Sequence, residues 1–374
     1  MKRLACVIIA FFITFAPIKA HCAEVSVSAG AAVLYCADNG AVYYSKNENK
    51  PMKPASTTKL MTTLLTLEYA AKNNKTVTFT KEMTAEGSSM YLKVGERVTL
   101  RDLAVGLMLC SGNDAANAAA ISIAGSVEKF SELMNRRAAE IGMMNTHFVT
   151  PSGLDAQEHY SSALDLAVLM AQALKNPDFR ALTARKTATV SFIKPKNKTT
   201  TYSNHNRLLS LYKHCIGGKT GFTTAAGRCL VSAAKKDGLT LVCVTLDDRR
   251  DWADHMSLYD YGFNTYKMNE LDDTDLCLDV PTVGGKKPFT TVVGEGRSVF
   301  VTKAADKEKI ESKMLLDNFI YAPVKKKQAL GAVEYFYKGK IIASHKLRAI
   351  ENNNSLIENK SFLDVIKGML QNAF

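Results

Sequence analysis

The sequence lacks the residue spacings that hold metals and redox centres. Its eight cysteines include no Cys-x-x-Cys pair, and its seven histidines form no His-Glu-x-x-His array. Zinc sites, dithiol motifs and zinc peptidases depend on such spacings, so we expect no metal and no cofactor, and we discount a metallopeptidase. Six cysteines follow residue 23, and we interpret most of them as small buried hydrophobic residues: Cys36, Cys110, Cys215, Cys229, Cys243 and Cys277.

The composition also lacks the features of collagen, of disordered chains and of multi-pass membrane proteins. At the N-terminus, Lys2 and Arg3 precede an apolar run at 4–16, which is shorter than the roughly 20 residues that a spanning helix needs. Pro17 and the small residues around 20–23 follow, in the order typical of a secretory signal. We predict a signal peptide at 1–23 and an exported protein; an uncleaved membrane anchor is the alternative.

Acidic residues are fewer than basic ones. The chain has 48 lysines and arginines against 36 aspartates and glutamates, which gives a net charge of +12. A basic surface suits nucleic acid, acidic lipid or an anionic wall polymer, although it can also be simply solvated. Because export removes a protein from nucleic acid, we expect no nucleic-acid partner.

The order of the predicted elements indicates an α+β domain. Strands at 32–37 and 41–45 flank Asp38-Asn39-Gly40, which favours a tight hairpin turn. Strands near both ends of the segment, with helices between them, predict an antiparallel sheet flanked by helices. The other predicted elements are a helix after Pro54, helices at 100–109 (with a capping pattern at Thr99), 114–124 and 127–141, strands at 229–234 and 240–245, and a closing helix at 252–264.

From residue 271 the pattern changes to short β-like runs between glycine and lysine turns, which predicts a small all-β domain. Asn352-Asn353-Asn354-Ser355 is typical of a linker. We therefore divide the chain into a signal peptide at 1–23, an α+β domain at 24–268, an all-β domain at 269–350, and a linker with an amphipathic helix at 351–374.

The predicted tail helix has one apolar stripe. Such a stripe is typical of an interfacial membrane anchor, and a helix packed on its own domain is the alternative. The tail lacks a polybasic face, so we expect acidic lipids to strengthen its binding only weakly. The stripe consists of Phe362, Val365, Ile366, Met369, Leu370 and Ala373.

Ser56 and Lys59 form the most informative of five Ser-x-x-Lys pairs. The spacing puts a hydroxyl and an amine on one helix face, but the pattern alone is weak. Ser56 follows Pro54-Ala55 at the start of an apolar helix, where the positive end of the helix dipole favours an alkoxide-like nucleophile. Lys59 can take the Ser56 proton only as a neutral amine, which requires burial or a nearby cation.

Ser111-Gly112-Asn113 follows the next long helix and offers two further polar groups. Ser111 can pass a proton to a leaving amine. Asn113 can hold a substrate amide and orient Lys59.

Lys219-Thr220-Gly221 occurs once, directly before the last hairpin of the α+β domain. We predict an edge strand here, with which a peptide substrate can pair. Lys219 can bind a substrate carboxylate and lower the pKa of Lys59, and Gly221 lets the substrate backbone approach. The backbone N–H groups of Ser56 and Phe222 would form an oxyanion hole.

The three motifs in this order resemble those of the serine D-alanyl-D-alanine carboxypeptidases, which are low-molecular-mass penicillin-binding proteins, with Gly112 in place of an aspartate found in related enzymes. The resemblance implies a β-lactamase/transpeptidase-like domain and the roles given above to Ser56, Lys59, Ser111, Asn113, Lys219, Thr220, Gly221 and Phe222. The matching segments are 54–62, 111–115, 142–148, 204–209, 218–223 and 321–325, with a Gram-positive-like Asp251-Trp252 and Asp254-His255.

The same resemblance implies a substrate and an inhibitor. The substrate is a peptidoglycan stem pentapeptide that ends in D-Ala-D-Ala, from which the enzyme removes the last residue through an acyl-enzyme on Ser56. β-Lactam antibiotics bind covalently to the same serine. The expected place of action is the extracytoplasmic face of the cell membrane or the cell wall, with the tail helix on the membrane surface.

Two other functions fit the same fold. A class A β-lactamase needs a carboxylate base for deacylation; Glu158 lies in the right region, but the asparagine that usually follows is missing. A catalytically idle wall-binding protein is disfavoured because every catalytic position is filled.

Overall fold

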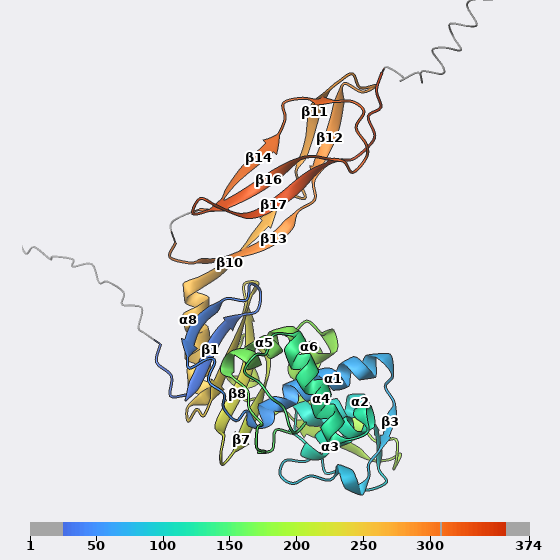
Figure 1. The fold of residues 1–374 in the computed structure, drawn as a ribbon, viewed down its shortest axis with the longest axis vertical. Coiled ribbons are helices and arrows are strands. Elements are labelled where there is room, and N and C mark those ends of the chain that lie inside the picture. The colour runs from blue at the N-terminus through green and yellow to red at the C-terminus, as the bar shows by residue number, and fades with distance from the viewer. Residues whose placement is uncertain (1–24, 307–308, 357–374) are drawn as a thin grey trace, which may run out of the picture.

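The computed structural model describes residues 25–306 and 309–356, so the predicted signal peptide and tail helix lie outside the described residues. The described chain forms two bodies, one mixed and one built of strands, that follow each other along the long axis of the molecule (Figure 1). No helix within these residues is long and apolar enough to cross a membrane.

The first body is built on a five-stranded antiparallel sheet with the strand order β2-β1-β9-β8-β7. Both predicted hairpins are confirmed, and β1 pairs with β9, so strands from the two ends of the segment meet in one sheet. The order also leaves β7 at one edge, as predicted for 219–221. The strands are β1 (Ala31–Cys36), β2 (Val42–Lys46), β7 (Cys215–Thr223), β8 (Gly227–Lys236) and β9 (Leu239–Leu246).

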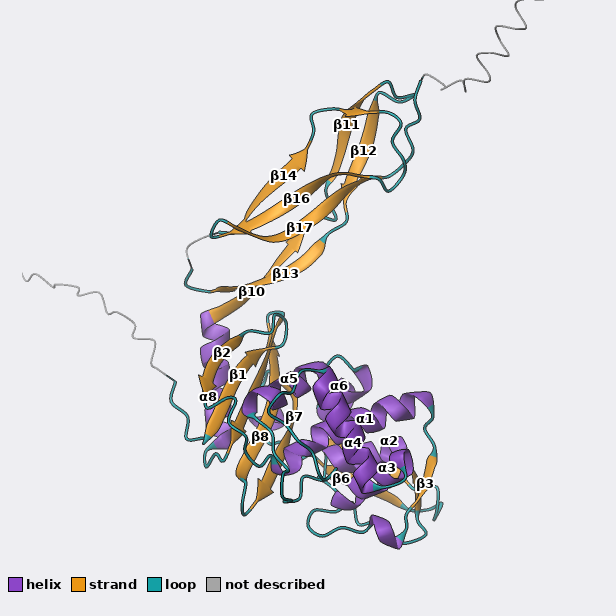
Figure 2. Cartoon of the chain, viewed as in Figure 1, coloured by secondary structure: helices purple, strands orange, loops and turns teal. Residues whose placement is uncertain are grey.

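Helices cover both faces of this sheet because its central strands are apolar on both sides (Figure 2). Val33 and Val244 face the large helical cluster, whereas the alternate residues Leu34 and Cys243 face α8. Thr99 caps α2 through Asp102, as expected. The helices are η1 (Ala55–Thr58), α1 (Lys59–Lys72), η2 (Lys81–Met83), α2 (Leu100–Met108), α3 (Asn113–Ala124), α4 (Val127–Glu140), α5 (Ala163–Ala173), α6 (Pro177–Thr183), α7 (Leu208–Leu211) and α8 (Asp251–Thr265).

Two small ribbons within the helical region were missed by the sequence analysis. They are short and rich in threonine, so they carry little apolar periodicity. They pair β3 (Thr76–Thr78) with β4 (Arg97–Thr99), and β5 (Thr187–Ser191) with β6 (Thr199–Ser203). All six described cysteines are free thiols; three are buried, Cys110 and Cys215 are half-buried and Cys277 is exposed.

The second body consists of strands, as predicted. A two-stranded ribbon joins β10 (Tyr266–Asp272) to β13 (Arg297–Lys303), and a six-stranded sheet has the order β14-β16-β17-β12-β11-β15. The remaining bounds are β11 (Cys277–Val283), β12 (Phe289–Gly294), β14 (Glu311–Leu316), β15 (Ile320–Tyr321), β16 (Ala329–Tyr337) and β17 (Lys340–Ala349).

The interpretation of 352–355 as a linker was wrong. Asn353 is buried and its side chain bonds the backbone of Lys287 and Phe289 and the hydroxyl of Thr290. Ser355 forms a bridge with Gly285. Polar residues that look like a linker can instead saturate backbone groups between neighbouring strands.

The two bodies meet without an intervening loop, since α8 ends at Thr265 and β10 begins at Tyr266. The rings of Tyr43 and Tyr266 stack with their centroids 3.6 Å apart. Met268 and Val301 from the ribbon pack against the α8 side of the first body.

A buried hydrogen-bond chain joins β13 to β17 in the second body. His345 contacts the Ser298 hydroxyl at 3.0 Å and an Asp273 carboxylate oxygen at 2.9 Å. The backbone of Gly296 covers the imidazole, because a Cβ added there would lie 1.9 Å from the ring. The Ser-His-Asp arrangement therefore has no room for a substrate over its histidine, and we interpret it as structural.

Candidate active site

Ser56 and Lys59 lie at the junction of η1 and α1, where the chain enters the helical layer. Pro54 precedes η1, and Ala55 adopts a left-handed φ of 48° that turns the backbone into the helix. The Ser56 hydroxyl and the Lys59 amine are 2.9 Å apart. The predicted one-turn pairing is confirmed.

Lys59 is fully buried, and its amine has three partners. It donates to the Asn113 carboxamide oxygen at 2.6 Å and to the Ser152 carbonyl at 2.5 Å. Burial, reinforced by the positive charge of Lys219, holds the pKa of Lys59 well below its usual value. A neutral amine has two hydrogens and one lone pair. Because Asn113 and Ser152 take the hydrogens, the lone pair is left for the Ser56 hydroxyl.

The loop between α2 and α3 is held in place by Asp114. Its carboxylate accepts the backbone N–H groups of Met90 and Leu92 at 2.8 and 3.1 Å. Asn113 donates from its amide nitrogen to the Glu86 carbonyl at 2.6 Å, which points its oxygen at Lys59. The aspartate after the motif therefore fixes the orientation of the asparagine that Lys59 needs.

Lys219 lies beneath the cleft and is 1% exposed. Its amine donates to the Ser111 hydroxyl at 3.0 Å and to the Thr220 carbonyl at 2.8 Å. Burial lowers the pKa of Lys219 to about 7. Lys219 is thus placed to exchange a proton with Ser111 near neutral pH.

Gly221 brings β7 against the nucleophile. A Cβ added at Gly221 would come within 3.0 Å of the Pro54 carbonyl oxygen and of the Ser56 backbone nitrogen. A larger residue would push β7 away from η1. The next residue, Phe222, is largely exposed at the rim of the cleft.

These groups open onto one cleft of about 310 Å³. Five of the sequence-predicted residues line it, while Lys59, Asn113 and Lys219 are buried below. The sequence analysis gave no role to the other five residues that line the cleft. The lining residues are Ser56, Ser88, Ser111, His205, Thr220, Gly221, Phe222, Arg228, Asp251 and Trp252.

Arg228 is the most informative residue that the sequence analysis missed. It lies on β8 opposite Phe222, and its guanidinium binds both carboxylate oxygens of Asp251 at 2.9 Å. The guanidinium also lies 5.8 Å from the ring of Trp252. The Arg228 side chain remains 46% exposed. It is the one arginine or lysine that lines the cleft among the described residues.

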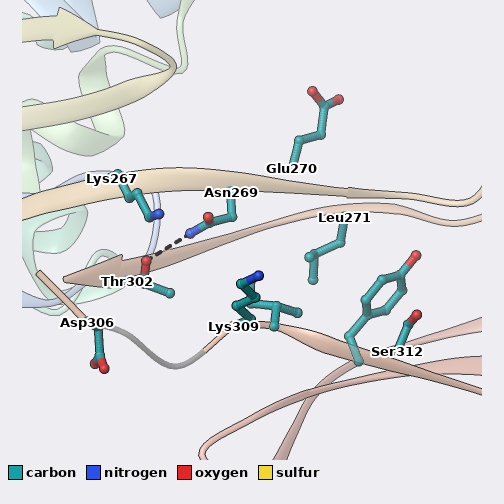
Figure 3. Close-up of a pocket in the computed structure, with 10 residues that line it drawn as sticks. Lys267, Asn269, Glu270, Leu271, Thr302, Asp306, Lys309 and Ser312 are labelled. Atoms are coloured by element: carbon teal, nitrogen blue, oxygen red, sulfur yellow. Dashed lines mark hydrogen bonds between the residues drawn. The ribbon is translucent and has the colours of Figure 1, made fainter. Parts of the chain in front are cut away.

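A larger cavity of about 500 Å³ lies in the second body, between the β10–β13 ribbon and β14 (Figure 3). Asn269 donates to Thr302 at 3.0 Å along its wall. No serine paired with a buried amine lines it, so the chemistry belongs to the smaller cleft. Within the described chain, no three His, Cys, Asp or Glu side chains lie close enough to bind a metal together.

His159 supports the nucleophile from below. It contacts the Thr58 hydroxyl through Nε2 at 2.9 Å, and its Nδ1 accepts the backbone N–H of Val149 at 2.9 Å and of Thr150 at 3.2 Å. Burial and the nearby His147 lower the pKa of His159 to about 4. The contacts require a neutral ring, because a protonated Nδ1 could accept neither amide.

Comparisons with known proteins agree with this site. Residues 18–250 match the family described as D-alanyl-D-alanine carboxypeptidase, and residues 263–354 match the C-terminal domain of penicillin-binding protein 5. D-alanyl-D-alanine carboxypeptidase DacF of Bacillus subtilis is 31% identical over 94% of this chain and 95% of its own. DacC of Escherichia coli is 33% identical over 92% of this chain and 90% of its own.

Solved structures give the same result. Penicillin-binding protein 5 from Haemophilus influenzae superposes with a TM-score of 0.67 at 27% identity, covering 88% of this chain and 98% of that one. The Streptomyces K15 DD-transpeptidase superposes with a TM-score of 0.61 at 32% identity, covering 64% of this chain and 98% of that one.

The low pKa of His159 predicts acid sensitivity. In the unfolded chain the ring takes up a proton below about pH 6.5, whereas the folded protein resists protonation down to about pH 4. Through His159, the free energy of unfolding therefore falls by about 3 kcal/mol as the pH drops from 6.5 toward 4, and it is unaffected above pH 6.5. We expect His159→Gln to flatten the pH dependence of the unfolding free energy in this window, measured by urea titrations at several pH values.

The partly exposed His214 provides the control. His214→Gln is titrated with urea over the same pH range. An unchanged slope in His159→Gln would mean that His159 is protonated in the folded protein. Residual slope is expected in every variant, because burial lowers the pKa of His255 to about 3.

Proposed function

Because the chain belongs to the D-alanyl-D-alanine carboxypeptidase family and is a serine hydrolase of that family, we propose that Ser56 attacks the peptide bond between the last two D-alanines of a peptidoglycan stem peptide. The observation that carries this proposal is the arrangement of hydrogen bonds at Lys59. The amine lies 2.9 Å from the Ser56 hydroxyl, 2.6 Å from the Asn113 carboxamide oxygen and 2.5 Å from the Ser152 carbonyl oxygen. When Lys59 is neutral, its two hydrogens stay with Asn113 and Ser152, and its lone pair takes the Ser56 proton.

Acylation begins when Lys59 takes the Ser56 proton and the oxygen attacks the carbonyl carbon. The substrate lies along β7, the free edge of the sheet, and pairs with it as an added strand. The backbone N–H groups of Ser56 and Phe222 stabilise the oxyanion. Gly221 allows β7 to lie close to the backbone nitrogen of Ser56. This supports the proposal that the N–H groups of Ser56 and Phe222 bind the same oxyanion.

Collapse of the tetrahedral intermediate expels D-alanine. Ser111 donates its proton to the departing nitrogen and regains one from Lys219, which lies 3.0 Å away and has a pKa of about 7. Asn113 holds the substrate amide. Water then attacks the ester carbon and passes a proton through Ser111 to Lys219. The bond to the Ser56 oxygen breaks, Lys59 returns its proton to that oxygen, and the shortened peptide leaves with a new carboxyl group.

Recognition of the substrate's terminal carboxylate needs a positive charge at the cleft surface. We assign this to Arg228 together with Lys219 and Thr220. Lys219 is buried and about half protonated near pH 7, whereas a guanidinium keeps its charge. Asp251 and Trp252 hold the Arg228 guanidinium beside the strand that receives the substrate.

The cleft favours a peptidase over a β-lactamase. Its one lining carboxylate within the described chain is Asp251, which is paired with Arg228. Glu158 is exposed and lines a different cavity. A covalent β-lactam adduct would therefore lack a carboxylate base and hydrolyse slowly. The complete hydrogen-bond network around Lys59 also disfavours an idle wall-binding protein.

We also propose that the protein works outside the cytoplasm and on a membrane. The signal-type sequence at 1–23 supports export, and the apolar stripe of 362–373 supports an interfacial anchor. We retain the division at 1–23, 24–268, 269–350 and 351–374 as a proposal for the domains, with 351–356 packed on the all-β domain.

Ser56 should be the site of β-lactam acylation. Purified protein treated with penicillin should gain one adduct that maps to Ser56 by peptide mass spectrometry and is lost slowly. Lys59→Arg should abolish the adduct, because an arginine stays protonated. An adduct at another residue, or normal acylation of Lys59→Arg with a native circular dichroism spectrum, would refute the assignment.

Arg228→Gln should weaken capture of the carboxylate. Loss of a charged hydrogen-bonding partner predicts a fall in kcat/KM on the order of 10- to 100-fold for a peptide ending in D-Ala-D-Ala. The same peptide with an amidated C-terminus should show little difference between wild type and variant. Arg249→Gln, on an exposed position nearby, is the control. An equal loss on both peptides would assign Arg228 a structural role.

The tail should hold the protein on a bilayer mainly through apolar contacts. We expect the chain 24–374 to float with phosphatidylcholine vesicles and to stay bound at high salt. A chain that ends at Leu356 should not float with these vesicles and should keep its peptidase activity. If instead 24–374 stays in solution and truncation lowers the melting temperature by several degrees, the tail helix packs on its own domain.

A further inference from the structure

The all-β domain ends in a surface that combines exposed apolar side chains with lysines. Three segments meet there, 281–289, 319–327 and 350–356, and we call this surface the distal tip. Their backbones are joined by hydrogen bonds from Ala322 to Val283, from Lys286 to Asn354 and from Leu356 to Gly284, each between 2.8 and 3.0 Å. The distal tip lies at the end of the molecule opposite the first body (Figure 1).

Strand register places the apolar residues of the tip on one outward face. Val283 pairs with Tyr321 in parallel, and Pro281 pairs with Phe289 in antiparallel register. Phe319, just before β15, lies on the side of Tyr321, because the two rings contact each other. The opposite face carries buried residues such as Ile320 and Thr290.

These outward side chains are unusually exposed for their type. Tyr321 is 69% exposed and Leu356 is 64% exposed, and Val283, Phe289 and Phe319 are each about half exposed. The rings of Phe319 and Tyr321 contact each other at 5.5 Å between centroids. Exposed apolar side chains that gather on the neighbouring strands β12, β11 and β15, with two aromatic rings in contact, are typical of an interaction surface.

The charge around the patch is positive. The three segments contain five lysines, Lys286, Lys287, Lys325, Lys326 and Lys327, and a single acid, Glu351, which is paired with Lys287. Two copies of this chain would therefore bring lysines together if they met through their tips. Apolar rings surrounded by lysines match instead a bilayer surface with anionic headgroups.

The position of the chain end supports the same partner. The described chain ends at Leu356 within the tip, and the amphipathic sequence at 362–373 follows only a few residues later. Any membrane that this sequence reaches lies next to the tip. We propose that the distal tip is a second membrane-contact site, which binds bilayers containing anionic phospholipid through its apolar face and its lysines. This goes beyond the proposed peptidase activity, and the binding can be measured on a chain that lacks the tail helix.

The tail lacks a polybasic face, so the two sites would contribute different parts of the binding. The tail supplies apolar binding, and the tip supplies the electrostatic part. With the tip on the bilayer, the Ser56 cleft is held away from the surface by the length of the all-β domain (Figure 1).

The test uses the chain 24–356, which lacks the tail helix, in flotation with two kinds of vesicle. We expect this chain to bind vesicles of phosphatidylcholine with 30% phosphatidylglycerol and to be released by high salt. Its binding to pure phosphatidylcholine should be weaker by about tenfold or more. Lys325→Glu with Lys326→Glu should lower binding by about tenfold or more. The triple variant Phe289→Ser, Phe319→Ser, Tyr321→Ser should also weaken it.

A matched control replaces three exposed apolar residues of the same domain outside the tip: Val299→Ser, Met314→Ser and Ile341→Ser. It should bind as the parent does. Failure of 24–356 to float with either vesicle, or equal losses in tip and control variants, would overturn the proposal. If the aromatic substitutions leave binding unchanged, the tip binds through charge alone and the proposed apolar contact is wrong. Peptidase activity, measured in parallel, keeps this result separate from that of the catalytic assignment.

Discussion

In the proposed mechanism Lys59 has to be neutral before Ser56 can react, and much of the first body serves this condition. Burial of the amine lowers its pKa, and Asn113 and Ser152 occupy its hydrogens. Each of these partners is itself fixed: Asn113 by the Glu86 carbonyl, and its loop by Asp114. A change in any of these contacts would alter how the Lys59 lone pair is oriented toward Ser56.

The second lysine works under a different constraint. Lys219 is also buried, but its pKa of about 7 leaves it able to give or take a proton near neutrality, and Ser111 is its immediate partner. The two lysines come from different elements, Lys59 from α1 and Lys219 from β7. Gly221 permits β7 to lie close to η1, because a side chain at that position would separate them.

The all-β domain extends the molecule instead of enlarging the cleft. It begins directly after α8, and the Tyr43–Tyr266 stack and a small apolar cluster hold it against the first body. Its free end carries the exposed aromatic residues, the lysines and the exit of the chain. Catalysis and surface attachment are therefore assigned to opposite ends of one elongated protein.

The sequence by itself determined the features that rest on local chemistry. Asn39-Gly40 and Asp237-Gly238 specify their turns, Thr99 and Asp102 cap a helix, and one helical turn brings Ser56 to Lys59. The edge strand at Lys219 was predicted from its expected role instead, because a peptide substrate can pair with a free edge. Only the tertiary structure decided the rest. The Ser152 carbonyl reaches Lys59 across 93 positions, and Arg228 meets Asp251 across 23. Burial of Asn353, and the placing of Phe289 beside Pro281 and of Tyr321 beside Val283, depend on strand pairing. Such contacts leave no periodic trace, because register between distant strands is set by the packing of the whole sheet and not by neighbours along the chain.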